Sequence, residues 1–268
     1  MEIRIFNVEH GFCAYIIADN RNVMLIDCGH NRKTGFRPSN YLVHNKCTGI
    51  ERFIVTNYDE DHLSDLPRLR ENLPIVTLQR NKSIDADTLK TIKLRSGPLQ
   101  PGIESMLDMI RTYTSDVTDP PEFPQIELTT FNNRYPEFDD TNNLSLVIFL
   151  YYRNTHIVFP GDLEKAGWKK LLEQSSFRDH LSKVNFFVAS HHGRETGYCE
   201  EVFQYCKPEI IIISDEQKQY ETQETTYRKH ASGVMFGETR RYVLTTRKDG
   251  MITINQIEGQ GPRISTAN

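Results

Sequence analysis

The sequence predicts an α/β fold in which β-sheets are covered by helices. Short runs rich in β-branched and aromatic residues occur near both ends of the chain, and segments with helical spacing lie in each half. The strict alternation of strand and helix that a dinucleotide-binding sheet requires is missing from the pattern. With 268 residues, of which 38% are hydrophobic, the chain is long enough to form a substantial core.

The first part of the chain is expected to form mainly strands, together with one helix. A polar segment follows them along the sequence. The strand-like runs are 2–6, 13–18, 22–29, 52–57 and 74–79, and a helix that Asp61 or Ser64 can cap is expected over 61–72. Residues 80–101 are polar and poorly periodic, 102–113 have helical spacing, and 115–125 contain three prolines. We therefore expect one domain over residues 1–268 with an insertion or lid around 80–125.

The second half returns to regular structure. Strands are expected at 126–132, 144–152, 156–162, 184–190 and 209–216, and helices at 164–174, 197–206 and 225–234. The runs 240–246 and 251–258 are expected to form a closing hairpin turned by the sequence RKDG.

Charge and cysteine content limit the class of protein. The net charge of −4 and a pI near 6.2 are not those of a globally basic nucleic-acid or membrane-surface binder. A local cluster of Arg240, Arg241, Arg247 and Lys248 is either surface charge or a contact for a phosphate backbone. Five cysteines without a C-x-x-C pair, and apolar runs too short to cross a bilayer, lead us to expect a cytoplasmic protein with no membrane association.

Three polar clusters follow apolar strand-like runs directly. They are Asn57–His62 after FIV, Gly161–Asp162 after IVF, and Ser190–Gly193 after FFVA. Because strand ends in α/β folds present ligands and catalytic groups at a common edge, the three clusters are expected to converge. Carboxylate and imidazole groups bind divalent cations, and two cations would share a bridging carboxylate, for which Asp162 is the candidate.

Each cluster also has an ordinary structural explanation. The run Asp59-Glu60-Asp61 complements a helix dipole, PGD is a common turn, and HHG suits a solvated loop. The shared position of all three, each just past a strand, favours a metal site over three unrelated features.

These segments also carry a family resemblance. NVEHGFCAYIIADNRNVMLIDCG, TNYDEDHLSDL, NNLSLVIFL, IVFPGD, VASHHG and VLTTRKDGMITI resemble, in that order, the motifs of metallo-β-lactamase-fold hydrolases. The chain is most similar to the branch that contains the metallo-hydrolase domain of the competence DNA-uptake channel. The resemblance implies a four-layer αββα sandwich whose cleft holds one or two divalent metal ions, zinc or manganese.

The metal motif of this family is H-x-H-x-D-H, or H-x-D-x-D-H in the uptake-channel branch, and the corresponding residues here are Asn57, Asp59, Asp61 and His62. The resemblance implies a first ion at Asn57, Asp59 and the shared Asp162. It implies a second ion at Asp61, His62, Asp162 and either His191 or His192. Asn57 departs from the motif, because a neutral amide replaces a histidine nitrogen. A separate G-H motif is also missing, and Asn142 or Asn143 stands at that stage of the chain.

The resemblance implies a metal-dependent hydrolase that uses metal-activated water, a phosphodiesterase or nuclease for which nucleic acid is a candidate partner. A stand-alone effector in bacterial defence against phage is a setting that would suit such an enzyme. The candidate catalytic residues are Asp61, His192 and His230, a histidine serving to protonate the leaving oxygen. Asp27 is expected to buttress the metal loop, and His10 faces the site in the family. Two alternatives stay open: a hydrolase of a small thioester, lactone, lactam or cyclic nucleotide, and a non-catalytic binding module with a degraded metal site.

Overall fold

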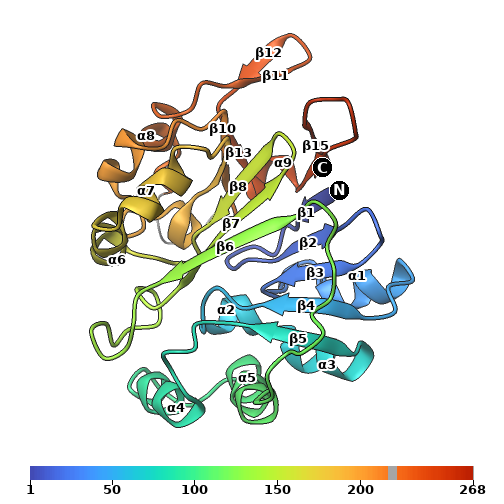
Figure 1. Cartoon of the computed structure of the whole chain (residues 1–268), viewed down its shortest axis with the longest axis vertical. Coiled ribbons are helices and arrows are strands. Elements are labelled where there is room, and N and C mark those ends of the chain that lie inside the picture. Colours follow the sequence, from blue (N-terminus) through green and yellow to red (C-terminus); the bar gives the residue numbers. More distant parts are fainter. Residues whose placement is uncertain (217–221, 268) are drawn as a thin grey trace.

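Two large β-sheets pack face to face in the computed structural model, which describes residues 1–216 and 222–267 (Figure 1). The first sheet has the strand order β15 (Arg263–Ala267), β14 (Met251–Asn255), β1 (Glu2–Ile5), β2 (Ala14–Ile17), β3 (Val23–Ile26), β4 (Ile50–Ile54) and β5 (Ile75–Gln79). The second has the order β13 (Val243–Thr245), β10 (Ile210–Ile213), β9 (Phe186–Val188), β8 (Thr155–Phe159), β7 (Leu146–Tyr152) and β6 (Glu127–Asn132). A small ribbon pairs β11 (Val234–Phe236) with β12 (Thr239–Arg241).

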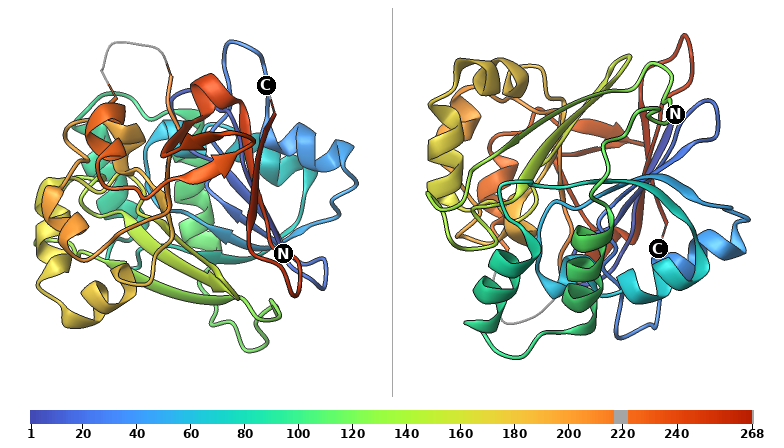
Figure 2. Two further views of the ribbon diagram at one scale, coloured as in Figure 1. Left: turned by 90° about the horizontal axis from the view of Figure 1, so that it is seen from above. Right: turned by 60° about the horizontal axis from the view of Figure 1, so that its bottom comes forward.

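Helices cover the outer faces of both sheets (Figure 2). The first sheet is covered by α1 (Pro38–His44), α2 (Glu60–Leu63), α3 (Leu66–Asn72), α4 (Ala86–Leu94) and α5 (Pro101–Thr112). The second is covered by α6 (Lys165–Leu172), α7 (Ser175–Leu181), α8 (Glu224–Arg228) and the 3-10 turn η2 (Glu200–Gln204), while the 3-10 turn η1 (Ser190–Gly193) follows β9. The short helix α9 (Thr246–Asp249) connects β13 to β14.

The residue pattern of β10 explains why the layers stack. Ile210 and Ile212 join the core between the sheets, whereas Ile211 and Ile213 join the core beneath the outer helices. Because side chains alternate along a strand, a run of four isoleucines supplies both cores at once. The four-layer αββα sandwich expected from the sequence is therefore confirmed.

Parallel pairing brings the functional loops to one edge. β3 runs parallel to β4 in the first sheet, and β8, β9 and β10 run parallel to one another in the second. The loops that follow β3, β4, β8 and β9 contain Asp27, Asn57–His62, Asp162 and His192, respectively. The carboxyl ends of these strands therefore present the predicted residues to a common site.

The segment 80–125 contains more regular structure than its sequence suggested. Residues 86–94, which seemed poorly periodic, form α4, and the Asp85 carboxylate caps it by accepting the Thr88 N–H at 2.7 Å. Leu89 of α4 and Ile110 of α5 are buried in the core of the first helical layer. The segment is thus built into that layer.

Other expectations were wrong. The runs 240–246 and 251–258 do not form a hairpin, because β13 and β14 belong to different sheets and α9 separates them. The expected helix 197–206 is only the 3-10 turn η2. Within residues 1–216 and 222–267, none of the helices combines the length and apolar character that a membrane span requires.

Candidate metal centre

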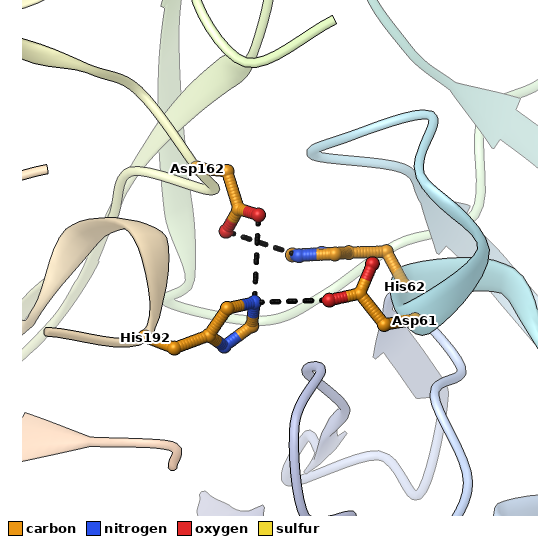
Figure 3. A group of neighbouring side chains, drawn as sticks. All are labelled: Asp61, His62, Asp162 and His192. Carbon is orange, nitrogen blue, oxygen red and sulfur yellow. Dashed lines mark ion pairs between the residues drawn. The ribbon is translucent and has the colours of Figure 1, made fainter. Parts of the chain in front are cut away.

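Four side chains from distant parts of the chain converge at the sheet edge (Figure 3). Asp61 and His62 come from α2, Asp162 from the loop after β8, and His192 from η1, and one ligand atom of each lies within 4.8 Å of the others. His62 Nε2 is 3.0 Å from Asp162 Oδ1, and His192 Nε2 is 3.3 Å from Asp61 Oδ2 and 3.4 Å from Asp162 Oδ2. The structure therefore brings these four predicted ligands together.

The two imidazoles are oriented through their other nitrogen. His62 Nδ1 lies 2.8 Å from Asp27 Oδ2, and His192 Nδ1 lies 3.1 Å from the backbone oxygen of Ser214. Both partners accept hydrogen bonds, so each Nδ1 carries a proton and Nε2 is the nitrogen directed into the cluster. Both Nε2 atoms are buried and have no hydrogen-bond partner among the described residues. Buried nitrogen atoms of this kind, facing two carboxylates, fit the ligands of a divalent metal ion.

Opposite charges dominate the electrostatics of the cluster. Burial alone would raise the pKa of Asp162, but His192 and His62 outweigh it and hold that pKa well below its usual value. Burial would likewise lower the pKa of His192, but Asp162 and Asp61 outweigh it and raise that pKa to about 9. Burial would also lower the pKa of His62, but Asp162 and Asp27 outweigh it and raise that pKa well above its usual value. Positive charge is strongly stabilised between the two carboxylates, which is the condition for binding a cation.

Two glycines that the sequence reasoning did not assign place Asp61. A Cβ atom on Gly11 would lie 2.3 Å from the backbone oxygen of Asp61, and one on Gly29 would lie 2.2 Å from it. Gly11 also has a φ of +131°, which residues with side chains rarely adopt. The pairs His10-Gly11 and Cys28-Gly29 were the available sequence signals, since each glycine ends a polar turn before or after a strand.

Left-handed backbone at η1 separates the adjacent histidines. His191 and His192 have φ values of 48° and 54°, and Gly193 follows with 73°. His191 then points toward Thr196 Oγ1 at 2.8 Å and Glu164 Oε1 at 3.2 Å, while His192 enters the cluster. Successive left-handed residues with side chains are strained, and such strain is typical of functional sites. The structure thus brings His192, and not His191, into the four-residue cluster.

Asn57 and Asp59 engage other groups. Asp59 Oδ1 lies 2.7 Å from Lys93 Nζ and accepts the Thr141 hydroxyl at 2.5 Å. Asn57 is fully buried, and its Oδ1 accepts the Asp59 N–H at 2.7 Å. The structure does not bring these two predicted ligands into the cluster.

Of two further histidines, His230 lies outside the cluster and His10 contacts it. His230 stacks on Phe203 with ring centroids 4.0 Å apart, and its Nε2 lies 2.8 Å from the Tyr198 hydroxyl. The structure therefore packs His230 on the outer helical layer and does not bring this predicted catalytic residue into the cluster. The His10 ring, in contrast, packs at a tilt of 55° against His192 with ring centroids 4.2 Å apart, and its Nε2 lies 3.3 Å from Asp61 Oδ2. Burial, followed by the charge on His192, lowers the pKa of His10 to about 4, so the imidazole is neutral near pH 7.

A cavity of about 560 Å³ lies beside Asp61. Its wall is formed partly by the segment after β5, through Lys93, Ser96 and Gln100. Cationic and acidic side chains share the lining; the basic members are His10, His30, Arg32, Lys33 and Lys93. The segment that the sequence suggested as an insertion therefore borders the candidate active site.

The basic cluster near the end of the chain is largely paired. Arg241 bonds both Asp249 oxygens at 2.9 and 3.0 Å, Lys248 Nζ lies 2.6 Å from Glu224, and Arg247 lies 3.4 Å from Asp215. These carboxylates neutralise most of the charge that a phosphate backbone would need.

Comparison with known proteins agrees with this architecture. Residues 12–193 match the family model of the metallo-beta-lactamase superfamily. The metallo-beta-lactamase fold protein YhfI from Bacillus subtilis is similar, with a TM-score of 0.50 and 11% identity over 94% of this chain and 99% of that one.

Two further solved structures are similar at a lower score. Igni18, a metallo hydrolase from Ignicoccus hospitalis, has a TM-score of 0.47 and 8% identity over 96% of this chain and all, 100%, of that one. A diphosphatase from the PhnP family has a TM-score of 0.49 and 9% identity over 96% and 98%. No curated protein matches the sequence. Because the family match covers more than half of the chain, the chain belongs to the metallo-β-lactamase superfamily.

Proposed function

We propose that this protein is a metal-dependent phosphodiesterase. The observation that carries the proposal is the pair of buried, unpartnered Nε2 atoms on His62 and His192, which face the carboxylates of Asp61 and Asp162 at the edge of a charged cavity. Two nitrogen and two oxygen donors suit zinc or manganese. Metal-dependent hydrolysis is the chemistry that the superfamily membership and this donor set support together.

A divalent cation held by these residues supplies Lewis acidity, which lowers the pKa of water and neutralises charge on a phosphoryl group. The protein's own residues prepare the site. Asp27 and the Ser214 carbonyl fix the two imidazoles, so little reorganisation is needed when the cation binds. His10, neutral and adjacent to Asp61, accepts a hydrogen bond from Arg194 at its Nε2 and forms part of the cavity wall.

The cavity is bounded and its lining carries charges of both signs. Arg32, Lys33 and Lys93 lie beside Glu9, Asp59, Glu60, Asp61 and Glu216, so the attraction of a phosphodiester would depend on the bound cation. The paired basic cluster around Arg241 gives little support to a long nucleic-acid track. We therefore favour a compact phosphodiester or the end of a strand. A nuclease of the uptake-channel branch, acting in defence against phage, is the more specific form of the proposal and rests on motif resemblance.

A panel of substrates tests the proposal. The protein is loaded with Zn²⁺ or Mn²⁺ and assayed on bis(p-nitrophenyl) phosphate, cyclic dinucleotides, single-stranded oligonucleotides, a chromogenic lactam and a thioester. Turnover of phosphodiesters is expected, with loss in Asp162→Ala and retention in Asp139→Ala, which changes an exposed aspartate paired with Arg95. Turnover confined to the lactam or thioester would establish the small-substrate alternative. Metal binding without turnover of any substrate would favour a binding module.

A further inference from the structure

The first metal position of the family motif contains an interlocked group of asparagines. Asn57 Nδ2 donates to Asn142 Oδ1 at 3.1 Å and approaches Ser145 Oγ at 3.4 Å. Ser145 Oγ in turn accepts the Asp162 N–H at 3.1 Å, so Asn57 lies one hydroxyl group away from the cluster. Asn57 Oδ1, the only atom through which an amide binds a metal, already accepts the Asp59 N–H. These side chains form a hydrogen-bonded support in place of nitrogen ligands.

The carboxylate at this position is also engaged. Lys93 reaches Asp59 from α4, with Nζ 2.7 Å from Oδ1, and the lysine side chain is only 14% exposed. The Thr141 hydroxyl donates to the same oxygen. An ammonium group next to the carboxylate satisfies its charge and repels a second cation. The residues present do not fit a metal ion here.

Lys93 and Asp59 line the same cavity as Asp61. A second metal ion would bring positive charge to the cavity wall next to Asp59. The Lys93 ammonium group already supplies positive charge there. The lysine comes from the segment 80–125, for which the sequence showed no family resemblance, and it contacts Asp59, two residues after the asparagine that stands at a histidine position of the motif.

We infer that the protein binds one metal ion and that the Lys93–Asp59 ion pair takes the place of the second. The ion binds at Asp61, His62, Asp162 and His192, and Lys93 both neutralises Asp59 and excludes a cation from it. This inference concerns the number of ions and is independent of the substrate proposed above.

Metal content and Mn²⁺ electron paramagnetic resonance test the inference without an activity assay. Wild-type protein saturated with Mn²⁺ and desalted is expected to contain about one ion per chain and to give the spectrum of isolated Mn²⁺. Asn57→His alone is expected to stay at one ion, because Lys93 remains. Asn57→His combined with Lys93→Met is expected to reach about two ions and to show spin coupling between them.

Matched variants separate charge from packing. Asn57→His combined with Lys93→Arg keeps the positive charge and is expected to stay at one ion. Asn57→His combined with Lys90→Met changes an exposed lysine of the same helix and should also stay at one. Circular dichroism and thermal melts verify that each variant folds.

Three results would overturn the inference: two ions in the wild type, two ions in Asn57→His alone, or one ion in folded Asn57→His/Lys93→Met. Failure of phosphodiester hydrolysis in the substrate panel would leave the ion count unchanged, so the two proposals fail separately.

Discussion

The carboxylate of Asp27 holds the imidazole of His62 at 2.8 Å, between Oδ2 and Nδ1, although Asp27 follows β3 and His62 lies in α2. Thr56 fixes this carboxylate by donating its N–H to Oδ1 at 2.7 Å and its hydroxyl to Oδ2. Asp27 is fully buried, so its orientation is set by these contacts alone. The sequence indicated Asp27 as a buttress of the metal loop, and its contacts are those of a residue that acts on the metal through His62.

Replacing Asp27 with asparagine should weaken metal binding. The Thr56 N–H holds the oxygen of the new asparagine at the position of Asp27 Oδ1. The asparagine NH2 group then takes the position of Oδ2, where it faces His62 Nδ1 and donates to it. The proton of His62 then moves to Nε2, which can no longer bind a cation. We expect zinc affinity to fall by roughly 10–100-fold.

Competition with a chromogenic chelator measures this affinity. Asp65→Asn is the matched control, because Asp65 is also fully buried but accepts from Arg37 and the Ser39 N–H. The control should lose stability and keep its zinc affinity. Equal affinity in wild type and Asp27→Asn would show that the contact does not set the protonation of His62.

The adjacent histidines offer a second test. His192→Ala removes a proposed ligand and should reduce metal affinity by more than the roughly 10–100-fold that loss of an outer partner costs. His191→Ala removes contacts to Thr196 and Glu164 and should change metal affinity by less than tenfold. Isothermal titration with Zn²⁺ compares the two variants. Equal losses would mean that the η1 turn reorganises when the metal binds.

The ligands that could be predicted from the sequence are those that follow regular strands. Asp61, His62 and Asp162 each follow an apolar run, and parallel pairing places those ends together. The choice between His191 and His192 depends on two left-handed φ angles, which no residue pattern specifies.

The remaining errors have similar physical causes. Lys93 was missed because α4 shows only a sparse apolar stripe, Ala86, Leu89 and Ile92, although Asp85 and Thr88 carried a helix cap signal. The false hairpin arose because β13 and β14 are each strand-like locally and only the tertiary fold assigns them to different sheets. Long-range pairing of this kind is set by the packing of the whole chain.

Gly29 provides a test of how the backbone places Asp61. Gly29→Ala would force a Cβ atom to within 2.2 Å of the Asp61 backbone oxygen, so the loop or α2 must shift. We expect the free energy of unfolding to fall by about 1–3 kcal/mol, together with weaker metal binding. Gly261→Ala is the control, because its added Cβ meets no atom within 4 Å. Urea denaturation and zinc titration of both variants check the expectation, and an effect of Gly29→Ala equal to that of the control would contradict it.

Asp215 should give the stability a distinct dependence on pH. The residue is 1% exposed, and burial raises its pKa to about 6 even though Arg247 lies 3.4 Å away and lowers it. The folded state therefore holds the Asp215 proton more tightly than the unfolded state, whose pKa is about 3.9. This contribution to stability is complete below the unfolded-state pKa and is lost as the pH rises through about 6.

Asp215→Asn removes the titration while keeping a similar shape. The free energy of unfolding of the wild type, minus that of the variant, should fall as the pH rises from 4 to 7, by up to about 3 kcal/mol. Urea denaturation at one-unit pH intervals, with chelator present so that metal binding does not contribute, measures the difference. A difference that stays constant or rises over this range would mean that Arg247 keeps Asp215 ionised in the folded protein, and the carboxylate would then contribute stability near pH 7.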